Sequence, residues 1–115
     1  LIQDGQAVDY SNDTKRFSGT FHGRRHPRTL MGYTKDGWVY FIVVDGRFPA
    51  QGEGMTIPEL QTLCKVLGLY EAMNFDGGGS STIWTKEFGV INHPYDNRTF
   101  DHKGERKVPN AIIVK

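Results

Sequence analysis

The pattern of apolar and polar positions is most informative in the middle of the chain. Segment 38–44, WVYFIVV, is an unbroken aromatic and β-branched run, the pattern of a strand buried on both faces. Segment 29–34, TLMGYT, alternates weakly. The dipeptide Asp36-Gly37 lies between them and indicates a two-residue hairpin turn. Counting outward from that turn, we predict a hairpin in which Arg28 faces Asp45.

The next segment, 55–69 (MTIPELQTLCKVLGL), has the pattern of an amphipathic helix. Thr56 and Glu59 have the spacing of a capping box, and Pro58 occupies the first turn, where a missing N–H group is tolerated. Gly68 marks the end of the helix. One apolar face follows the helical period and is made by Leu60, Leu63, Cys64 and Leu67.

The flanking segments complete a mixed α+β chain with one domain. In order, we predict a strand entering a turn at 1–8, mainly loop at 9–27, a strand at 70–75, a hairpin from STIWT and GVIN, a polar loop at 93–109 and a closing strand at 110–115. The expected fold class is α/β (mixed α+β), with a central mixed β-sheet, a hairpin, one βαβ crossover helix and further antiparallel strands.

The crossover predicts where the polar side chains meet. A strand, a helix and a second strand make a βαβ unit whose strands run parallel, so Asp45 and Asp76 arrive at the same sheet edge. Ligands of such sheets bind outside these carboxyl ends. The residues expected there are His26, Arg28, Asp45, Arg47, Asn74, Asp76 and the loop 77–81, which consists of Gly77, Gly78, Gly79, Ser80 and Ser81.

Carboxylates, guanidinium groups and a glycine-rich loop at one edge suit two kinds of chemistry, glycoside hydrolysis and the binding of phosphate. Strands lie about 4.8 Å apart, so carboxyl groups on such strand ends are expected roughly 5 to 10 Å apart, as in glycoside hydrolysis. Arginines can hold phosphate oxygens bidentately, and a glycine-rich backbone can approach an oxyanion closely. A nucleotide-binding loop would end in lysine and lead into a helix, and neither follows here.

Composition excludes several other classes. With 14 Lys plus Arg against 13 Asp plus Glu, the net charge of +1 gives no general attraction to nucleic acid. Cys64 is the only cysteine, so neither an intrachain disulfide nor a cysteine-based zinc cluster can form, and we expect it in the core. No apolar run approaches the roughly 20 residues that span a bilayer.

Several short motifs, taken in order, resemble the phosphodiester glycosidase family. They are HPRT, VVDGR, EGMTIPEL and NFDGGGSST, followed by VIN and the closing PNAIIV. The resemblance implies an extracytoplasmic (secreted, periplasmic or cell-surface) hydrolase that cleaves the bond between a sugar anomeric carbon and a phosphodiester, such as an N-acetylglucosamine-1-phosphodiester. Domains of this family include an upstream segment, so the resemblance leads us to expect that residues 1–115 are the C-terminal part of a single such domain.

The resemblance carries roles to Arg28, Asp45, Arg47, Glu53, Asn74, Asp76 and the loop 77–81. We expect Asp76, with either Asp45 or Glu53, to form the carboxylate pair. Arg28 and Arg47 would hold phosphate, and Asn74 would bind a sugar hydroxyl. Ser80 and Ser81 are expected to donate hydrogen bonds to the phosphate or the sugar. His26 is placed with the substrate-binding residues and interpreted as a positioning or solvated residue rather than a base. His22, His93 and His102 lack metal-ligand spacing and are interpreted as surface residues.

Other interpretations stay open at this stage. Asp45 could start a turn or pair with Arg28 across the hairpin, and Glu53 could be a solvated carboxylate. We predict no required cofactor, although Asp45, Glu53 and Asp76 are oxygen ligands suited to a divalent cation. The expected partners are a sugar phosphodiester or glycan and the N-terminal half of the same domain. The alternatives to catalysis are a phosphosugar-binding module and a fragment inactive without that half.

Overall fold

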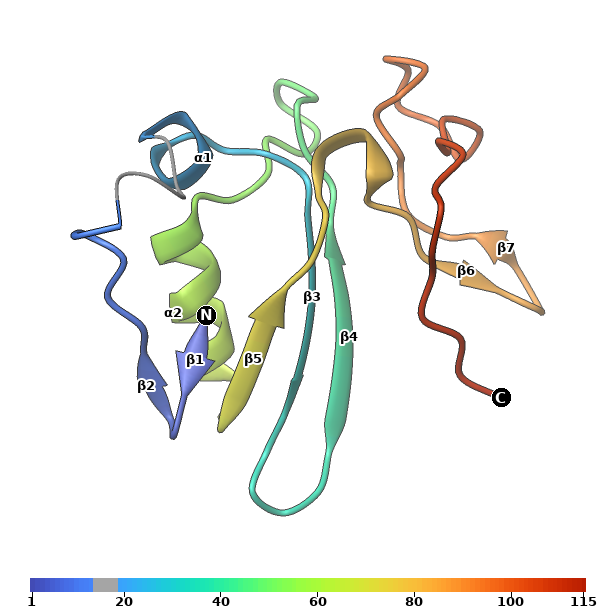
Figure 1. Cartoon of the computed structure of the whole chain (residues 1–115). Helices are drawn as coiled ribbons and strands as arrows, with labels where there is room; N and C mark the ends of the chain where they lie inside the picture. Colours follow the sequence, from blue (N-terminus) through green and yellow to red (C-terminus); the bar gives the residue numbers. More distant parts are fainter. Residues whose placement is uncertain (14–18) are drawn as a thin grey trace.

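The structure, a computed structural model, describes residues 1–13 and 19–115 and is built around a five-stranded β-sheet (Figure 1). In spatial order, its strands are β2 (Gln6–Ala7), β1 (Ile2–Gln3), β5 (Glu71–Asn74), β3 (Arg28–Tyr33) and β4 (Val39–Val44). The other elements are helices α1 (Gly19–Gly23) and α2 (Ile57–Val66), the 3-10 turn η1 (Gly78–Ser80) and the two-stranded sheet of β6 (Trp84–Thr85) and β7 (Gly89–Val90). The predicted mixed α+β class is confirmed, but every described strand pairing is antiparallel.

The predicted crossover brings two strand ends to one edge, although its strands are not neighbours. Strands β4 and β5 both pair antiparallel with β3, which lies between them. They therefore run in the same direction, with α2 connecting them along the chain (Figure 1). Asp45 directly follows β4, Asp76 follows β5 after one residue, and β3 begins at the same edge with Arg28.

The β3–β4 hairpin is confirmed, but its predicted register is wrong by one residue. Its turn contains three residues, because the Thr34 N–H donates to the Trp38 carbonyl at 2.9 Å and Gly37 adopts φ +99°. Arg28 consequently lies opposite Val44 rather than Asp45. Side chains alternate along a strand, so Arg28 shares the core face of β3 with buried Leu30, and Val44 is the β4 residue opposite it on that face.

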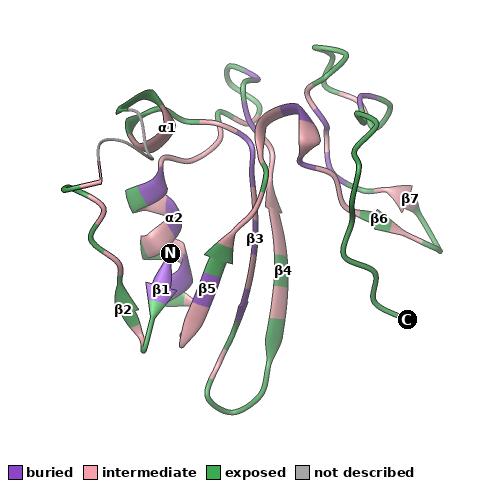
Figure 2. Cartoon of the chain, viewed as in Figure 1, coloured by how far each residue is buried: buried purple, intermediate pink, exposed green. Residues whose placement is uncertain are grey.

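Strand β4 is an edge strand with only one buried face, which corrects the prediction that it is buried on both. Tyr40, Ile42 and Val44 pack against the core, whereas Val39 is 55% and Phe41 40% exposed. The reason is that α2 covers a single face of the sheet. Figure 2 shows the alternation of exposed and partly buried positions along β4.

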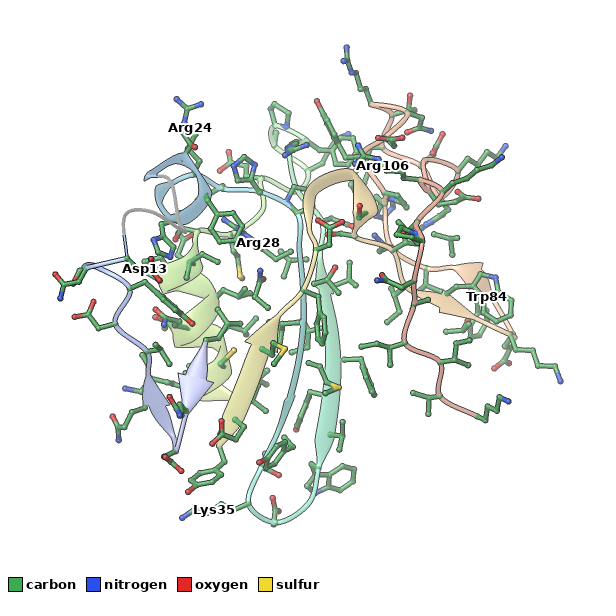
Figure 3. All side chains as sticks on the ribbon, viewed as in Figure 1. Asp13, Arg24, Arg28, Lys35, Trp84 and Arg106 are labelled. Atoms are coloured by element: carbon green, nitrogen blue, oxygen red, sulfur yellow. The ribbon has the colours of Figure 1, made fainter. Side chains whose placement is uncertain are left out.

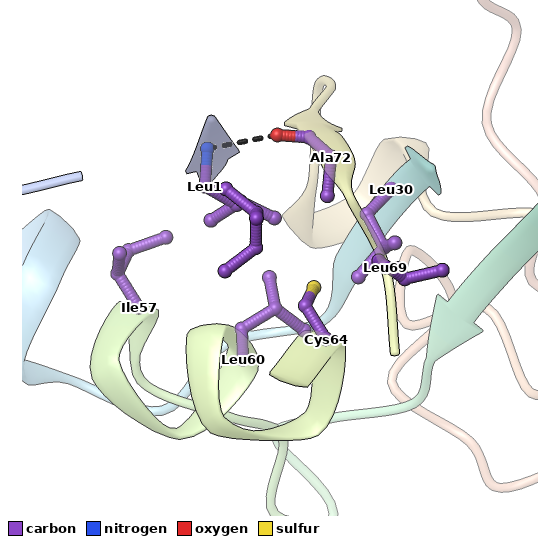
Figure 4. Close-up of a cluster of buried hydrophobic side chains, with 8 residues drawn as sticks. Leu1, Leu30, Ile57, Leu60, Cys64, Leu69 and Ala72 are labelled. Carbon is purple, nitrogen blue, oxygen red and sulfur yellow. Dashed lines mark hydrogen bonds between the residues drawn. The ribbon is translucent and has the colours of Figure 1, made fainter. Parts of the chain in front are cut away.

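The core lies between α2 and the sheet (Figure 4). Thr56 and Glu59 form the predicted capping box, with Glu59 N–H donating to Thr56 Oγ1 at 3.2 Å and Thr56 N–H to the Glu59 carboxylate at 2.9 Å. Gly68, at φ +71°, follows the helix as predicted. Cys64 is fully buried, as expected. The buried cluster consists of Leu1, Ile2, Leu30, Ile57, Leu60, Cys64, Leu69 and Ala72.

The terminal segments agree only in part with the predictions. Strands β1 and β2 are joined by a turn in which Asp4 and Gly5 both have positive φ, and the β6–β7 hairpin is present. Segment 9–27 contains α1, which was not predicted, and part of it lies outside the described residues. Segment 110–115 has no regular secondary structure and is exposed, contrary to the predicted closing strand. No helix in the described ranges is long and apolar enough to cross a membrane.

Candidate functional site

The glycine-rich turn at the end of β5 is a closely packed element. A Cβ atom on Gly77 would lie 2.7 Å from the Pro27 carbonyl oxygen, and one on Gly79 would lie 2.5 Å from Nη2 of Arg106. Gly78 has φ +62°, a conformation that favours glycine. These contacts show why the run consists of glycine: neighbouring backbone and guanidinium groups occupy the space that side chains would need.

Most backbone N–H groups of this turn are already engaged. Gly77 donates to Oδ1 of Asp76 at 3.0 Å and Gly78 to the Pro27 carbonyl at 3.0 Å. Ser80 and Ser81 donate back into the turn, each at 3.2 Å. The expected backbone cradle for an oxyanion is therefore largely closed. What the turn offers instead is a surface on which long cationic side chains can lie.

Two arginines lie against adjacent glycines of the turn. Nη2 of Arg47 would be 3.2 Å from a Cβ atom on Gly78, and Arg106 covers Gly79 (Figure 3). Arg106 forms an ion pair with Asp96 at 2.6 Å, and the Asp96 carboxylate raises the pKa of Arg106, with a smaller contribution from Asp76. Sequence reasoning missed Arg106 because it lies in the polar segment 93–109, where no periodicity indicates what its side chains contact.

Arg47 is held by an aromatic ring and a neutral histidine. Its guanidinium lies 5.3 Å from the Tyr95 ring centroid, and its Nη2 is 3.2 Å from Nδ1 of His26. Burial lowers the pKa of His26, and the charge of Arg47 lowers it further. The neutral ring can accept from Arg47 at Nδ1 while Nε2–H donates to the Thr20 carbonyl at 3.3 Å. This contact fits the expected positioning role of His26.

Arg28 has a structural environment that does not fit the expected phosphate clamp. It is 2% exposed, and its guanidinium donates to the carbonyls of Met55, Phe21 and Arg24 at 2.9, 2.7 and 3.1 Å. Burial lowers the pKa of Arg28, and the nearby Arg47 lowers it further. Figure 3 shows Arg28 between α1 and β3, whereas Arg24 points away from the body of the chain. Arg28 therefore ties the loops around α1 and α2 to the sheet.

Asp45 is bonded to the segment after β7 rather than to Arg28. Its Oδ1 accepts from Asn92 Nδ2 at 3.0 Å, and its Oδ2 lies 2.8 Å from Nδ1 of His93. The His93 backbone N–H donates to both oxygens, at 2.9 and 3.0 Å. Asn92 Nδ2 also donates to the Ser81 carbonyl at 3.0 Å, which links Asp45 to the glycine-rich turn. His93, whose side chain is 26% exposed, is thus a surface residue that also takes part in this network, which the sequence did not indicate.

The other expected carboxylates differ in their availability. Glu53 pairs with Arg25 at 3.0 Å, and its side chain is 60% exposed, which agrees with the solvated interpretation. Asp76 is exposed and accepts a described hydrogen bond from its neighbour Gly77 alone. Asp76 is therefore the accessible carboxylate at the turn. No group of three or more metal-ligating side chains occurs among the residues that the structure describes.

The side chains expected to bind a ligand through polar groups differ in how accessible they are; they are Asn74, Ser80 and Ser81. Ser81 is 1% exposed and accepts from Thr29 Oγ1 at 3.2 Å, so it is closed to a ligand. Ser80 is half-buried on the turn. Asn74 donates to the Phe75 carbonyl at 3.0 Å, and its Oδ1 is buried with no described partner. It lines a surface hollow of about 680 Å³ along β5, away from the two arginines.

The family model for phosphodiester glycosidases matches residues 1–115. The chain belongs to the phosphodiester glycosidase family. Among solved structures, the catalytic domain of zebrafish N-acetylglucosamine-1-phosphodiester alpha-N-acetylglucosaminidase, auto-inhibited by its pro-peptide, superposes with a TM-score of 0.65 at 24% identity, over 83% of this chain and 33% of that one. At this identity, the likeness shows the fold. The motifs quoted from the sequence therefore identified the family correctly.

Two further relatives are more similar in sequence but much longer. A Burkholderia pseudomallei protein with a provisional description as exported gives a TM-score of 0.63 at 33% identity, over 73% of this chain and 16% of that one. The SPbeta prophage-derived uncharacterized protein YomE of Bacillus subtilis is 39% identical over 57 residues, 50% of this chain and 9% of YomE. The chain thus spans a third or less of each of these relatives.

Proposed function

We propose that this phosphodiester glycosidase chain supplies the phosphate-binding side of a site that hydrolyses sugar-1-phosphodiesters outside the cytoplasm. The observation that carries the proposal is the position of Arg47 and Arg106 on adjacent glycines of one turn. Within the described ranges, no carboxylate lies within ion-pair distance of Arg47. Its positive charge is available for an anion, and guanidinium groups suit the geometry of phosphate oxygens.

The reaction needs cationic groups that stabilise the negative charge on the departing phosphate and a carboxylate beside the sugar ring. Water bonds to the anomeric carbon, the bond to the phosphate oxygen breaks, and that oxygen keeps the electron pair. Arg47 and Arg106 stabilise the charge that develops on the departing phosphate. Asp76, exposed beside the turn, is the carboxylate assigned to the sugar side, where an oxocarbenium-like transition state gains from a negative charge. Ser80, half-buried on the turn, is the candidate for a sugar hydroxyl.

The test is hydrolysis of an N-acetylglucosamine-1-phosphodiester followed by ³¹P NMR, which separates the diester from the monoester product. Asp76→Asn is expected to abolish turnover without changing thermal unfolding. Arg47→Lys is expected to raise KM, because lysine cannot form the bidentate contact. Asp36→Asn, an exposed carboxylate in the β3–β4 turn at the other end of the sheet, is the matched control and should retain wild-type turnover. Unchanged turnover in Asp76→Asn would remove that residue from the mechanism.

A phosphosugar-binding module is the second candidate. It is favoured by the state of the other carboxylates: both oxygens of Asp45 are hydrogen-bonded, and Glu53 is paired with Arg25. A single open carboxylate suffices for binding, whereas glycoside hydrolysis generally uses two. Thermal stabilisation by the diester, without any monoester in the ³¹P spectrum, would select this function.

A further inference from the structure

His93 is held in a defined orientation by Asp45. The carboxylate receives the His93 backbone N–H and lies 2.8 Å from the ring Nδ1, so the main chain and the ring of one residue bind one carboxylate. When a carboxylate accepts from Nδ1–H, the neutral imidazole carries its proton on Nδ1 and leaves Nε2 as a bare base. The geometry therefore selects one tautomer of His93.

The ring of His93 is also fixed by its neighbours. Phe100 stacks on it, with centroids 3.8 Å apart and an interplanar angle of 9°, and the His102 ring lies 4.4 Å away. The His93 side chain remains 26% exposed, and none of the residues that the structure describes hydrogen-bonds its Nε2. The charged or titratable groups facing this ring are Asp45, at the end of β4, and His102, whose own Nδ1 is satisfied by the Asn92 carbonyl at 2.7 Å.

The same hydrogen-bond network reaches the glycine-rich turn. Asn92 Nδ2 donates both to Asp45 and to the Ser81 carbonyl, each at 3.0 Å. One amide group therefore sets the distance between the Asp45–His93 pair and the turn that carries the two arginines. Both oxygens of Asp45 have described donors, and the ring and the main chain of His93 supply most of these hydrogen bonds.

We infer that His93 is the proton acceptor of this site and that Asp45 is its positioning residue. This inference rests on the proposed sugar-phosphodiester hydrolysis. As the water oxygen bonds to the anomeric carbon, Nε2 takes one water proton, and the electron pair of the broken carbon–oxygen bond leaves with the phosphate. Asp45 stabilises the imidazolium that forms, which returns its proton to solvent. A good leaving group such as phosphate makes activation of water the more demanding task.

The tautomer can be tested without any substrate. In ¹⁵N-labelled full chain, two-dimensional ¹H–¹⁵N spectra of the imidazole rings should show neutral His93 as the Nδ1–H form. In Asp45→Ala, this preference should be lost for His93 but kept for His102, whose Nδ1 is bonded to the Asn92 carbonyl and not to Asp45. An Nε2–H form of His93 in the wild type would overturn the inference, whatever the turnover.

The kinetic arm compares kcat/KM of the wild type and His93→Gln at about pH 7. His93→Gln should lower kcat/KM about 10²- to 10⁴-fold, because water then loses its proton acceptor. The control Asp36→Asn, in the β3–β4 turn at the other end of the sheet, should keep the wild-type value. A folded His93→Gln with wild-type kcat/KM would overturn the inference. Absence of turnover in a wild type that shows the Nδ1–H tautomer would overturn the hydrolysis proposal and the proton-acceptor role, and would leave the Asp45–His93 arrangement standing.

Discussion

The guanidinium of Arg106 lies directly on Gly79, so close that a Cβ atom there would be 2.5 Å from Nη2 and 2.7 Å from Oδ1 of Asp96. The third glycine of the turn thus leaves the space in which an ion pair from a distant part of the chain lies. The flexibility usually associated with glycine runs does not explain it. This contact makes the glycine turn and the Asp96–Arg106 pair one structural unit.

Gly79→Ala is therefore expected to displace the ends of the Arg106 and Asp96 side chains. Both side chains are partly exposed and can move, so the free energy of unfolding should change by less than about 1 kcal/mol. Displacement of the guanidinium should weaken binding of a sugar phosphodiester, which calorimetric titration measures. Gly23→Ala is the control, because nothing lies within 4 Å of a Cβ atom at that position in α1. Equal affinity of both variants for the diester would contradict a binding role for Arg106 at Gly79.

Arg28→Lys distinguishes a structural arginine from a phosphate ligand. Lysine cannot reach the three carbonyls that the buried guanidinium binds, and the lost charge-assisted hydrogen bonds are expected to lower the free energy of unfolding by about 1.5–3 kcal/mol. Arg24→Lys, at an exposed side chain on the same loop, should be neutral. The KM of folded Arg28→Lys for a sugar phosphodiester should equal that of the wild type; a large rise with unchanged stability would restore the clamp role.

The lowered pKa of His26 predicts that the folded chain loses stability on acidification. Its pKa is lowered in the folded chain by burial and by Arg47, whereas in the unfolded chain it has the ordinary value of about 6.5. The unfolded state therefore binds the proton first, and the stabilising contribution, present above the unfolded value, is lost as pH falls through the lowered folded value. His26→Asn, which keeps an acceptor but does not titrate, should show a smaller decrease in unfolding free energy between about pH 7.5 and about pH 5.5. An identical decrease in both proteins would argue against this origin.

Because α2 covers only one face of the sheet, truncating an apolar side chain should lower the free energy of unfolding more on the covered face than on the other. Leu60 is fully buried between α2 and the sheet, so Leu60→Ala is expected to cost about 2–5 kcal/mol. Val39→Ala on the exposed face of β4 should cost less than about 1 kcal/mol, since little area is removed from contact. Chemical denaturation measures both. Comparable losses would mean that the outer face of β4 is covered in solution.

Local patterns were sufficient for the elements of the fold. The Thr56–Glu59 capping box, the apolar period that buries Leu60 and Cys64, and Gly68 after the helix all act within a few residues of one another. The hairpin was visible for the same reason. Its register was not, because Lys35 joins Asp36-Gly37 in a three-residue turn, and a count from the two-residue alternative shifts every pair by one.

The site was only partly accessible to such reasoning. The order of strand, helix and strand is a property of the sequence, and it placed Asp45 and Asp76 after strands that end at one sheet edge. The roles within that edge depend on which distant segment packs there. Asp45 and His93 are 48 residues apart, and nothing local to either indicates that they are bonded.

By itself, the sequence determined the family, the secondary structure around α2 and the sheet edge on which polar side chains gather. Only the tertiary structure decided that Arg28 is buried as a tie between loops, that β4 is an edge strand, that Arg106 lies on Gly79 and that His93 is bonded to Asp45. The physical reason is that periodicity and capping act between near neighbours along the chain. Partners for a buried guanidinium or a carboxylate are chosen by packing between segments far apart in sequence.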